Sequence, residues 1–574
     1  MIRDKLKFDA SESPPLFTTI SLAFMHVLLV FDAIIFIPNV LGKTAGIAPQ
    51  SLAFITFGSI LVSAVFTFLQ SRTRFGIGAG FVLFTGSYSA FLLCSVDAVK
   101  MGGLPLLASM TLLTVPLVFL YTFFIRFFRH IITPAVGGVV ILLIATAMVP
   151  IGLGLWAGSS VPEAAASTVS FARLAIGAVT VLTLTLLMLF GSTALRLWSP
   201  LIAMASGYGL AFLTGELNFD NTASAAWIGL PELSAWPGLE LNIQAMHLPL
   251  LFAFGMGMVA SMIESTGNIM LVQQISTRNF RRVSYDQVQS GLYCDGLSKV
   301  AAGALGTTVP SVYCDNLPLI EMTGVASRRI GTIGACLLLL LAFMPKVSGI
   351  ILDMPGPVIG GFLIVIAGML FHAGFGLVAM TKLNNQHGLI LGLSLVVGLV
   401  AGGKSFFPGV VPASLSPLLQ NSVAMGGFTA FILSTLAYLA PKKGIEGVFR
   451  LDVAELPALQ RLLTSGRARL GLTDMEYNVL SLCCEEVFCH MAAEGGKGQN
   501  YSLTLRMSKA EDGYFTEMVC GHMMDDINNF ALPESLLQAT PAELDQLGLV
   551  LFSQYARDVK HLEISGYSYI SFLV

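Results

Sequence analysis

The chain has 574 residues, of which 55% are hydrophobic and 11% are charged, and its formal net charge is −3. Soluble domains average about 25% charged residues, so this composition excludes an ordinary soluble protein and indicates an integral membrane protein in the lipid bilayer. Because the net charge is slightly negative and the arginines are scattered, nucleic acid is excluded as an expected partner.

Apolar stretches of about 20 residues recur along the chain and predict fourteen membrane spans. We expect the spans at residues 17–41, 51–70, 77–97, 104–125, 131–153, 172–191, 197–214, 248–275, 287–304, 311–325, 330–348, 357–380, 387–402 and 423–440. The first stretch is long enough to span and lacks a small-residue cleavage site, so we expect it to remain as a helix. The third and tenth spans are rich in Gly, Pro, Ser and Thr, and interrupted spans of this kind usually line a cavity.

The tenth span predicts a broken helix. Pro310 and Pro318 bracket residues 315–316, so regular helical hydrogen bonding is not expected there. We expect an extended strand that leads into a half-helix, with backbone N–H groups turned toward a ligand. Residues 83–91 of the third span are the matching segment.

A repeated motif predicts internal symmetry. Pro134-Ala-Val-Gly-Gly138 opens the fifth span and Pro357-Val-Ile-Gly-Gly361 opens the twelfth. The two spans are seven places apart in the order of spans, and because seven is odd the two copies cross the membrane in opposite senses. This pattern predicts a 7+7 inverted repeat.

Positive charges predict the orientation. If the N-terminus is cytosolic, most Lys and Arg residues between spans fall on the cytosolic face, and the longest opposite loop, residues 215–247, has none. The positive-inside rule therefore places the N- and C-termini in the cytosol. The membrane that we expect is the cytoplasmic (inner) membrane.

Glu264 is the only ionisable residue in the apolar segment 248–272. A carboxylate at mid-membrane costs about 2.5–3.5 kcal/mol, so a sequence that keeps one is expected to use it on a substrate or ion. Asn268 lies one turn further on the same helical face and is expected to support the site, although it cannot titrate. The alternative interpretation is that Glu264 only bonds neighbouring helices.

Several motifs together resemble the nucleobase–ascorbate transporters, also called nucleobase:cation symporters of the xanthine/uracil permease type. They are Met25-His26 with Pro38, Gly86-Ser-Tyr-Ser89, Glu264-Ser-Thr-Gly-Asn268, and Asp315-Asn316 with Thr323-Gly324. The resemblance covers about residues 15–440. It implies a core domain that holds the substrate, a gate domain built from spans five to seven and twelve to fourteen, and a homodimer.

The resemblance also implies a site for a planar base. Carboxylates accept N–H bonds from a ring edge, and backbone N–H groups, expected at Tyr88 and Cys314, bind ring carbonyls. The expected substrate-binding residues are Glu264, Asp315, Asn316, Tyr88, Cys314 and His26. Coupling or support of the site is expected from Asn268, Asp32 and Thr323.

Some of these roles have open alternatives. Asp315 is shorter than the family's usual side chain and is alternatively a cap for the half-helix. His26 either positions the site or packs helices, and Asp32 is either a proton relay or a buried structural partner. Pro318 stands where the family's signature normally has Gly.

The expected function is import of a nucleobase, of the xanthine/urate or uracil type, by symport with a cation, either a proton or sodium. Two alternatives remain. One is an inorganic anion permease of the sulfate/bicarbonate type, whose site should avoid a carboxylate such as Glu264. The other is a nucleobase sensor that signals through the tail.

The composition changes near Pro441, which predicts a separate cytosolic domain. Helices are expected at 456–470, 474–493 and 542–559, and hairpins at 501–520 and 562–573. The predicted domains are the N-terminus 1–16, the transporter 17–440 and the tail 441–574. The predicted fold class is an all-α polytopic membrane protein with two broken helices, followed by an α/β sandwich domain.

The tail resembles the ATPase-type (GHKL) domain of anti-sigma-factor serine kinases, through Leu482-Cys-Cys-Glu-Glu-Val-Phe-Cys-His490 and Leu547-Gly-Leu549. Family members hold magnesium with an Asn four residues after the Glu, where this chain has His490 after Glu486. Residues 519–526 also lack the adenine-loop glycines. We therefore expect a degenerate regulatory domain that binds a cytosolic regulator, with no cofactor, no metal site and no enzymatic activity. Two alternatives stay open for the tail: a domain that binds ATP, and an α/β domain that is unrelated to this family.

Overall fold

The computed structural model describes most of the chain, in two compact units. The described residues are 6–73, 76–124, 134–158, 170–278, 283–313, 316–379, 385–403, 419, 421–439, 444–494, 501–510, 513–521, 527, 547–564 and 567–574. One unit comprises Met1–Arg278 and Gln287–Tyr438, and the other comprises Asn279–Asp286 and Leu439–Val574.

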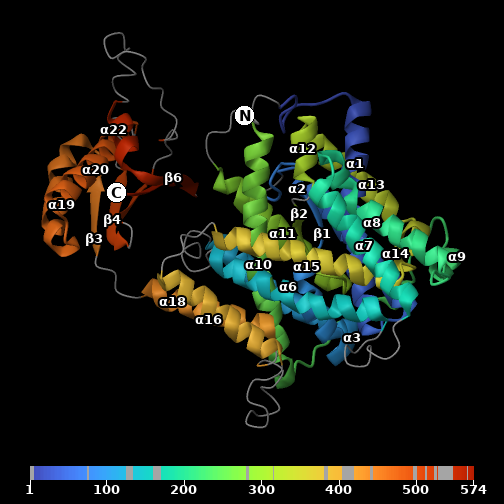
Figure 1. The fold of residues 1–574 in the computed structure, drawn as a ribbon. Helices are drawn as coiled ribbons and strands as arrows, with labels where there is room; N and C mark the ends of the chain where they lie inside the picture. Colours follow the sequence, from blue (N-terminus) through green and yellow to red (C-terminus); the bar gives the residue numbers. More distant parts are fainter. Residues whose placement is uncertain are drawn as a thin grey trace. The chain divides into compact units, whose positions relative to one another are not determined.

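The first unit is almost entirely helical (Figure 1). Its elements are α1 (Leu16–Ala45), α2 (Pro49–Gln70), β1 (Phe84–Ser87), η2 (Ser89–Phe91), α3 (Leu92–Thr114), α4 (Pro116–Phe123), α6 (Pro134–Ala157), α7 (Phe171–Phe190), α8 (Thr193–Leu213), α9 (Asp220–Ser224), η4 (Leu233–Ala235), η5 (Ala245–His247), α10 (Leu248–Ser276), α11 (Tyr285–Leu305), β2 (Pro310–Tyr313), α12 (Leu317–Thr323), α13 (Arg328–Ala342), α14 (Pro345–Leu352), α15 (Gly356–Ala379), α16 (Asn385–Gly402) and α18 (Ser422–Leu439). Of the helices in the described ranges, seven are long and apolar enough to cross a membrane, or eight if the bent pair α13 and α14 is one span.

Glycine divides the region of the third and fourth predicted spans. Within α3, Gly102 and Gly103 have non-helical backbone angles, and Gly103 has a φ of 73°. A positive φ is readily adopted only by glycine, so the chain can break here without the strain that a side chain would cause. Pro105 follows the break and restarts the helix.

Helices α6 and α15 lie side by side (Figure 1) and meet through small residues. A Cβ atom placed on Gly360 would lie 2.9 Å from the Cα of Trp156, and one placed on Gly374 would lie 2.8 Å from the Cγ of Leu142. Both helices carry the Pro-x-x-Gly-Gly motif at their start, and small residues let helix backbones approach closely in a membrane.

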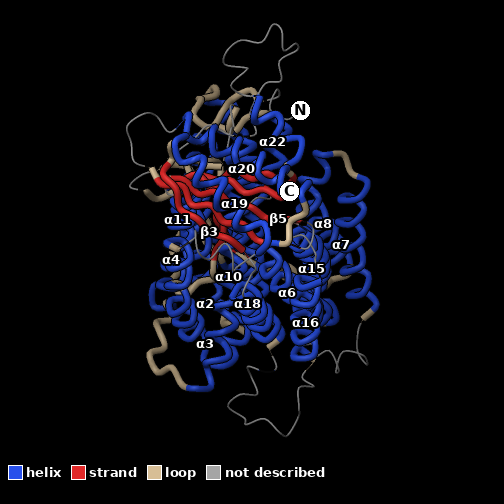
Figure 2. The backbone as a smooth tube through the Cα atoms, turned by 90° about the vertical axis from the view of Figure 1, so that its left-hand side faces the viewer, coloured by secondary structure: helices blue, strands red, loops and turns tan. Residues whose placement is uncertain are grey.

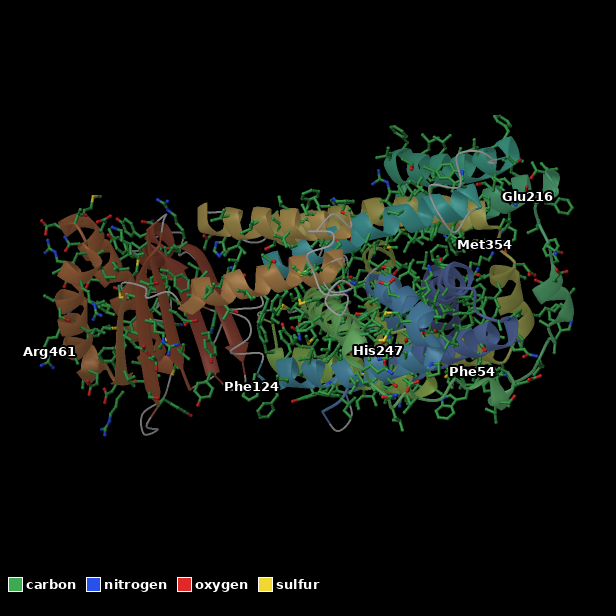
Figure 3. All side chains as sticks on the ribbon, turned by 90° about the horizontal axis from the view of Figure 1, so that it is seen from below. Phe54, Phe124, Glu216, His247, Met354 and Arg461 are labelled. Carbon is green, nitrogen blue, oxygen red and sulfur yellow. The ribbon has the colours of Figure 1, made fainter. Side chains whose placement is uncertain are left out.

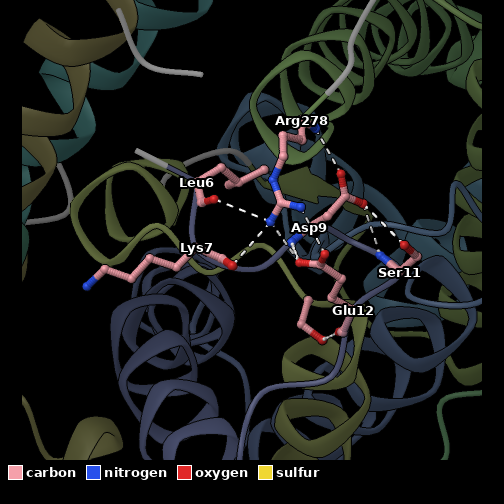
Figure 4. Close-up of polar contacts among 7 residues, drawn as sticks. Leu6, Lys7, Asp9, Ser11, Glu12 and Arg278 are labelled. Carbon is pink, nitrogen blue, oxygen red and sulfur yellow. Dashed lines mark hydrogen bonds and ion pairs between the residues drawn. The ribbon is translucent and has the colours of Figure 1, made fainter. Parts of the chain in front are cut away.

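An N-terminal strap, residues 6–12, ties the ends of α10 and α12 together. Its contacts with Arg278 are drawn in Figure 4. The Phe8 N–H donates to the Gly324 carbonyl at 3.0 Å, and the Ala10 N–H donates to the Ser276 carbonyl at 3.1 Å. Arg278 fixes the strap from the other side, because its guanidinium lies 3.0 Å from the Glu12 carboxylate. The strap therefore belongs to the helical unit.

The second unit is a five-stranded sheet with helices packed on it. Its elements are β3 (Gly444–Arg450), η6 (Val453–Glu455), α19 (Leu456–Leu470), α20 (Asp474–Glu494), β4 (Ser502–Ala510), β5 (Gly513–Cys520), α22 (Leu547–Tyr555), β6 (Arg557–Ile564) and β7 (Tyr567–Leu573). All strand pairs are antiparallel, in the order β3-β4-β5-β7-β6 (strands in red, Figure 2).

The core of this unit follows from two sequence periods. Cys484, Val487 and Met491 recur at helical spacing on α20, and Leu503 and Leu505 alternate along β4, so both faces are apolar and pack together. The outer face of α19 is polar and carries Arg461 (Figure 3).

Two tail elements differ from the sequence-based expectation. The helix expected over 542–559 ends at Tyr555 in the described residues, and β6 already begins at Arg557, where Asp558 has a φ of 51°. Strand β3 was not predicted, although Ile445 and Phe449 alternate inward along it. A short edge strand gives a weak signal because its inward residues become recognisable only once a partner strand is placed beside them.

Candidate functional site

The two interrupted spans pair with one another inside the helical unit. Strands β1 and β2 are antiparallel, with Phe84 opposite Tyr313 and Gly86 opposite Ser311, and every residue of both strands is buried. Each strand leads into helix: β1 into η2 and α3, and β2 toward α12. The expected strand followed by a half-helix is confirmed, and Pro318 is accommodated because it lies in the first turn of α12.

Gly86 makes the close approach of the two strands feasible. A Cβ atom there would lie 2.7 Å from Ile34 Cγ1 and 2.7 Å from Tyr313 Cε2. The Tyr313 hydroxyl donates to the carbonyl of Ser87, which fixes the ring against the glycine. Only a residue without a side chain fits this crossing.

Glu264 lies on α10 and is partly exposed. The hydroxyl of Tyr88, which follows β1 directly, donates to Glu264 Oε2. The backbone N–H of Tyr88 donates to the Val309 carbonyl at 2.9 Å. In this structure the pairing of the two interrupted spans therefore uses the Tyr88 N–H, and the phenol reaches the carboxylate; the expected role of Tyr88 toward a ligand stays a prediction.

His26 and Asn316 meet from α1 and the start of α12. The His26 Nδ1 and Asn316 Nδ2 atoms are 3.1 Å apart, and both side chains are buried. The His26 ring stacks on Phe84 of β1 with 5.7 Å between ring centroids. These contacts bring two expected site residues to the strand pair from separate helices.

Asn268 secures the second strand. Its amide donates to the Val312 carbonyl at 3.0 Å, so it supports β2 one turn away from Glu264. Thr323 has a different position, at the far end of α12, where its hydroxyl donates to the Leu319 carbonyl at 2.7 Å. Its described contacts are those of a helix end.

Three expected residues cannot be placed. Cys314 and Asp315 lie outside the described residues, as does the side chain of Asp32. Their roles stay predictions.

The antiparallel pair of β1 and β2 is therefore surrounded by four polar side chains: a carboxylate, a phenol, an imidazole and an amide. They belong to Glu264, Tyr88, His26 and Asn316. Residues 17–402 match the Permease family of the xanthine/uracil permease type. The chain belongs to this family. This permease is thus a multi-pass membrane transporter and not an enzyme.

The permease has characterised relatives over most of its length. The xanthine permease XanP of Escherichia coli (strain K12) is 29% identical over 451 residues, which cover 75% of this chain and 94% of that protein. The xanthine permease of Bacillus subtilis (strain 168) is 25% identical over 455 residues, which cover 76% of this chain and 97% of that protein. The structure of SLC26A9 matches with a TM-score of 0.50 and 11% identity, covering 82% of this chain and 78% of that one, and shows a shared fold.

Sequence reasoning missed a hydroxyl cluster beside Glu264 in the permease. Ser311 of β2 lies between two α10 residues, with its Oγ 3.0 Å from Ser261 Oγ and 3.1 Å from Ser265 Oγ. Ser265 also donates to Asp295 of α11 at 3.3 Å. The helical spacing of Ser261 and Ser265 was a usable signal, but their partner Ser311 is remote in sequence.

In the tail, Glu486 lies against the start of α22. A Cβ atom on Gly548 would overlap the Glu486 carboxylate, so the Glu486 side chain would have to shift to admit one. Burial raises the pKa of Glu486, and the neighbouring Glu485 raises it further. Burial also raises the pKa of Cys483 to about 11, so this thiol stays protonated at neutral pH and is not a nucleophile.

Proposed function

We propose that this permease imports a nucleobase of the xanthine/urate or uracil type by symport with a cation. The observation that carries the proposal is the position of Glu264, whose Oε2 accepts from Tyr88 while the carboxylate remains partly exposed beside the strand pair. A carboxylate held in this way keeps acceptor capacity for the N–H groups of a planar ring.

The coupling follows from the same carboxylate. Substrate N–H groups bind the ionised form, whereas a low-dielectric site favours the neutral form, so binding of the base by itself opposes protonation of Glu264. Symport therefore requires that the coupling cation accompanies the ionised carboxylate, either as a proton on a neighbouring acid or as a sodium ion. The core then moves against the gate to expose the site on the other side.

The proposed architecture is the fourteen-span, 7+7 inverted repeat with both termini cytosolic in the inner membrane. It is supported by the antiparallel pairing of β1 with β2, one from each half, and by the packing of α6 against α15, which open with the same motif. In this assignment α6, α7, α8, α15, α16 and α18 form the gate, through which a homodimer would assemble. The tail from residue 441 is a regulatory, degenerate GHKL-type domain.

The test is uptake of radiolabelled xanthine, urate and uracil by proteoliposomes, with and without an imposed pH gradient. Glu264→Gln should abolish accumulation while the protein still folds, and Glu232→Gln, at an exposed loop residue, should leave accumulation unchanged. Normal uptake by Glu264→Gln would contradict the assignment. Binding of a base without flux would identify a sensor, and uptake of sulfate or bicarbonate in place of bases would identify an anion permease.

A further inference from the structure

Helix α11 contains an ion pair that the proposed binding role does not use. Lys299 Nζ lies 2.5 Å from Asp295 Oδ2, one helical turn away, and both side chains are fully buried. Lysine and aspartate are almost never fully buried unless they are paired, and they keep their charges there only with a partner. The pair is therefore a specific feature of the interior of this permease.

The pair is connected to the nucleobase site through hydroxyl groups. Ser265, the residue after Glu264, donates to the same Asp295 oxygen at 3.3 Å, and its Oγ lies 3.1 Å from Ser311 of β2. Lys299 interacts electrostatically, in the described chain, with Asp295 and Cys294 on its own helix and with Glu264 on α10. The ion pair therefore interacts with Glu264 through charge, and it is joined to β2 through Ser265.

Asp295 and the Ser265 hydroxyl offer oxygen atoms of the kind that bind a hard cation. The second oxygen of Asp295, Oδ1, is buried and finds no hydrogen-bond partner in the described part of the chain. Carboxylate and hydroxyl oxygens are the groups that hard cations prefer. The cation that is present beside them is the Lys299 ammonium group, which is tethered to the helix.

We propose that Lys299 is a built-in counter-cation that occupies the position a coupling sodium ion would take beside Asp295. This inference rests on the proposed transport function and defines its coupling: the permease does not need sodium, because the charge that sodium would supply is part of the chain. Removing the ammonium group opens a site that an external sodium ion can fill.

The decisive experiment compares nucleobase uptake in sodium and in choline buffers at one fixed pH. The wild-type protein should take up the base at rates within twofold in the two buffers. Lys299→Met should lose at least tenfold in choline and regain most of that loss in sodium. Lys100→Met, at an exposed lysine, should behave as the wild type does. A sodium requirement in the wild type, or a Lys299→Met variant that is active without sodium, would overturn the proposal.

A second measurement decides the case in which Lys299→Met is inactive in both buffers. Thermal unfolding of the purified full-length variant should shift upward by several degrees in sodium relative to choline, and the double variant Asp295→Asn/Lys299→Met should lose this shift. The absence of a sodium-dependent shift in Lys299→Met would overturn the proposal. This measurement needs no substrate, so it tests the counter-cation role of Lys299 separately from the proposed nucleobase transport. If the transport assignment is wrong, the wild-type protein will show no uptake of the base.

Discussion

Gly86 provides a sharp test of the strand crossing. In Gly86→Ala the added Cβ would lie 2.7 Å from Ile34 Cγ1 and 2.7 Å from Tyr313 Cε2, whereas ordinary contacts are 3.4–4 Å, so the neighbours must retreat by roughly 1 Å. The Tyr313 ring cannot turn away without breaking its bond to Ser87, which is worth about 0.5–1.5 kcal/mol. Overpacking adds about 1–3 kcal/mol.

The expected result is weaker substrate binding together with lower stability. A total of about 2–4 kcal/mol corresponds to roughly 30- to 1000-fold if it falls wholly on binding, so we expect at least a tenfold rise in Kd even when part of it falls on folding. Equilibrium binding of radiolabelled base and thermal unfolding in detergent measure the two effects. The matched control is Gly209→Ala on α8, where a Cβ meets nothing within 4 Å. If Gly86→Ala binds within twofold of the wild type, the strand crossing does not shape the site.

Three further predictions concern helix packing and the strap. Gly360→Ala should destabilise the α6–α15 interface by about 1–3 kcal/mol, seen as a lower Tm. Gly368→Ala on the same helix, where a Cβ meets no atom within 4 Å, should leave the Tm unchanged. Equal Tm values for the two variants would show that the interface accommodates the added methyl group. Arg278→Ala should speed amide hydrogen exchange in the N-terminal strap, and Arg461→Ala on the tail should leave that exchange unchanged. Hydrogen bonding from Arg278 holds the pKa of Glu12 below its ordinary value of 4.5. The stabilisation of the strap is therefore present above that pH and is lost as the pH falls through the lowered pKa. Protection of the strap amides, relative to their intrinsic exchange rate at each pH, should fall in acid, and unchanged protection would contradict this.

Much of the candidate site could be proposed from local chemistry. Glu264 stood out because a carboxylate is costly in an apolar segment, and Asn268 follows from it by helical spacing. The contact of Tyr88 with Glu264 was not predictable from these patterns, because the two residues are 176 positions apart and a phenol has no periodic signal. The hydroxyl cluster was missed for the same reason, since Ser311 lies 46 positions from Ser265.

The sequence by itself determined the membrane class, and it located most helices of the first unit and the two breaks, because apolar length, Pro and Gly act locally on the chain. Tertiary structure alone decided that the two breaks pair as β1 and β2, that the Tyr88 N–H is taken by Val309, and that Ser265 joins Asp295 to the site. These outcomes depend on which distant segments share the interior, where buried polar groups must find partners that no local pattern specifies.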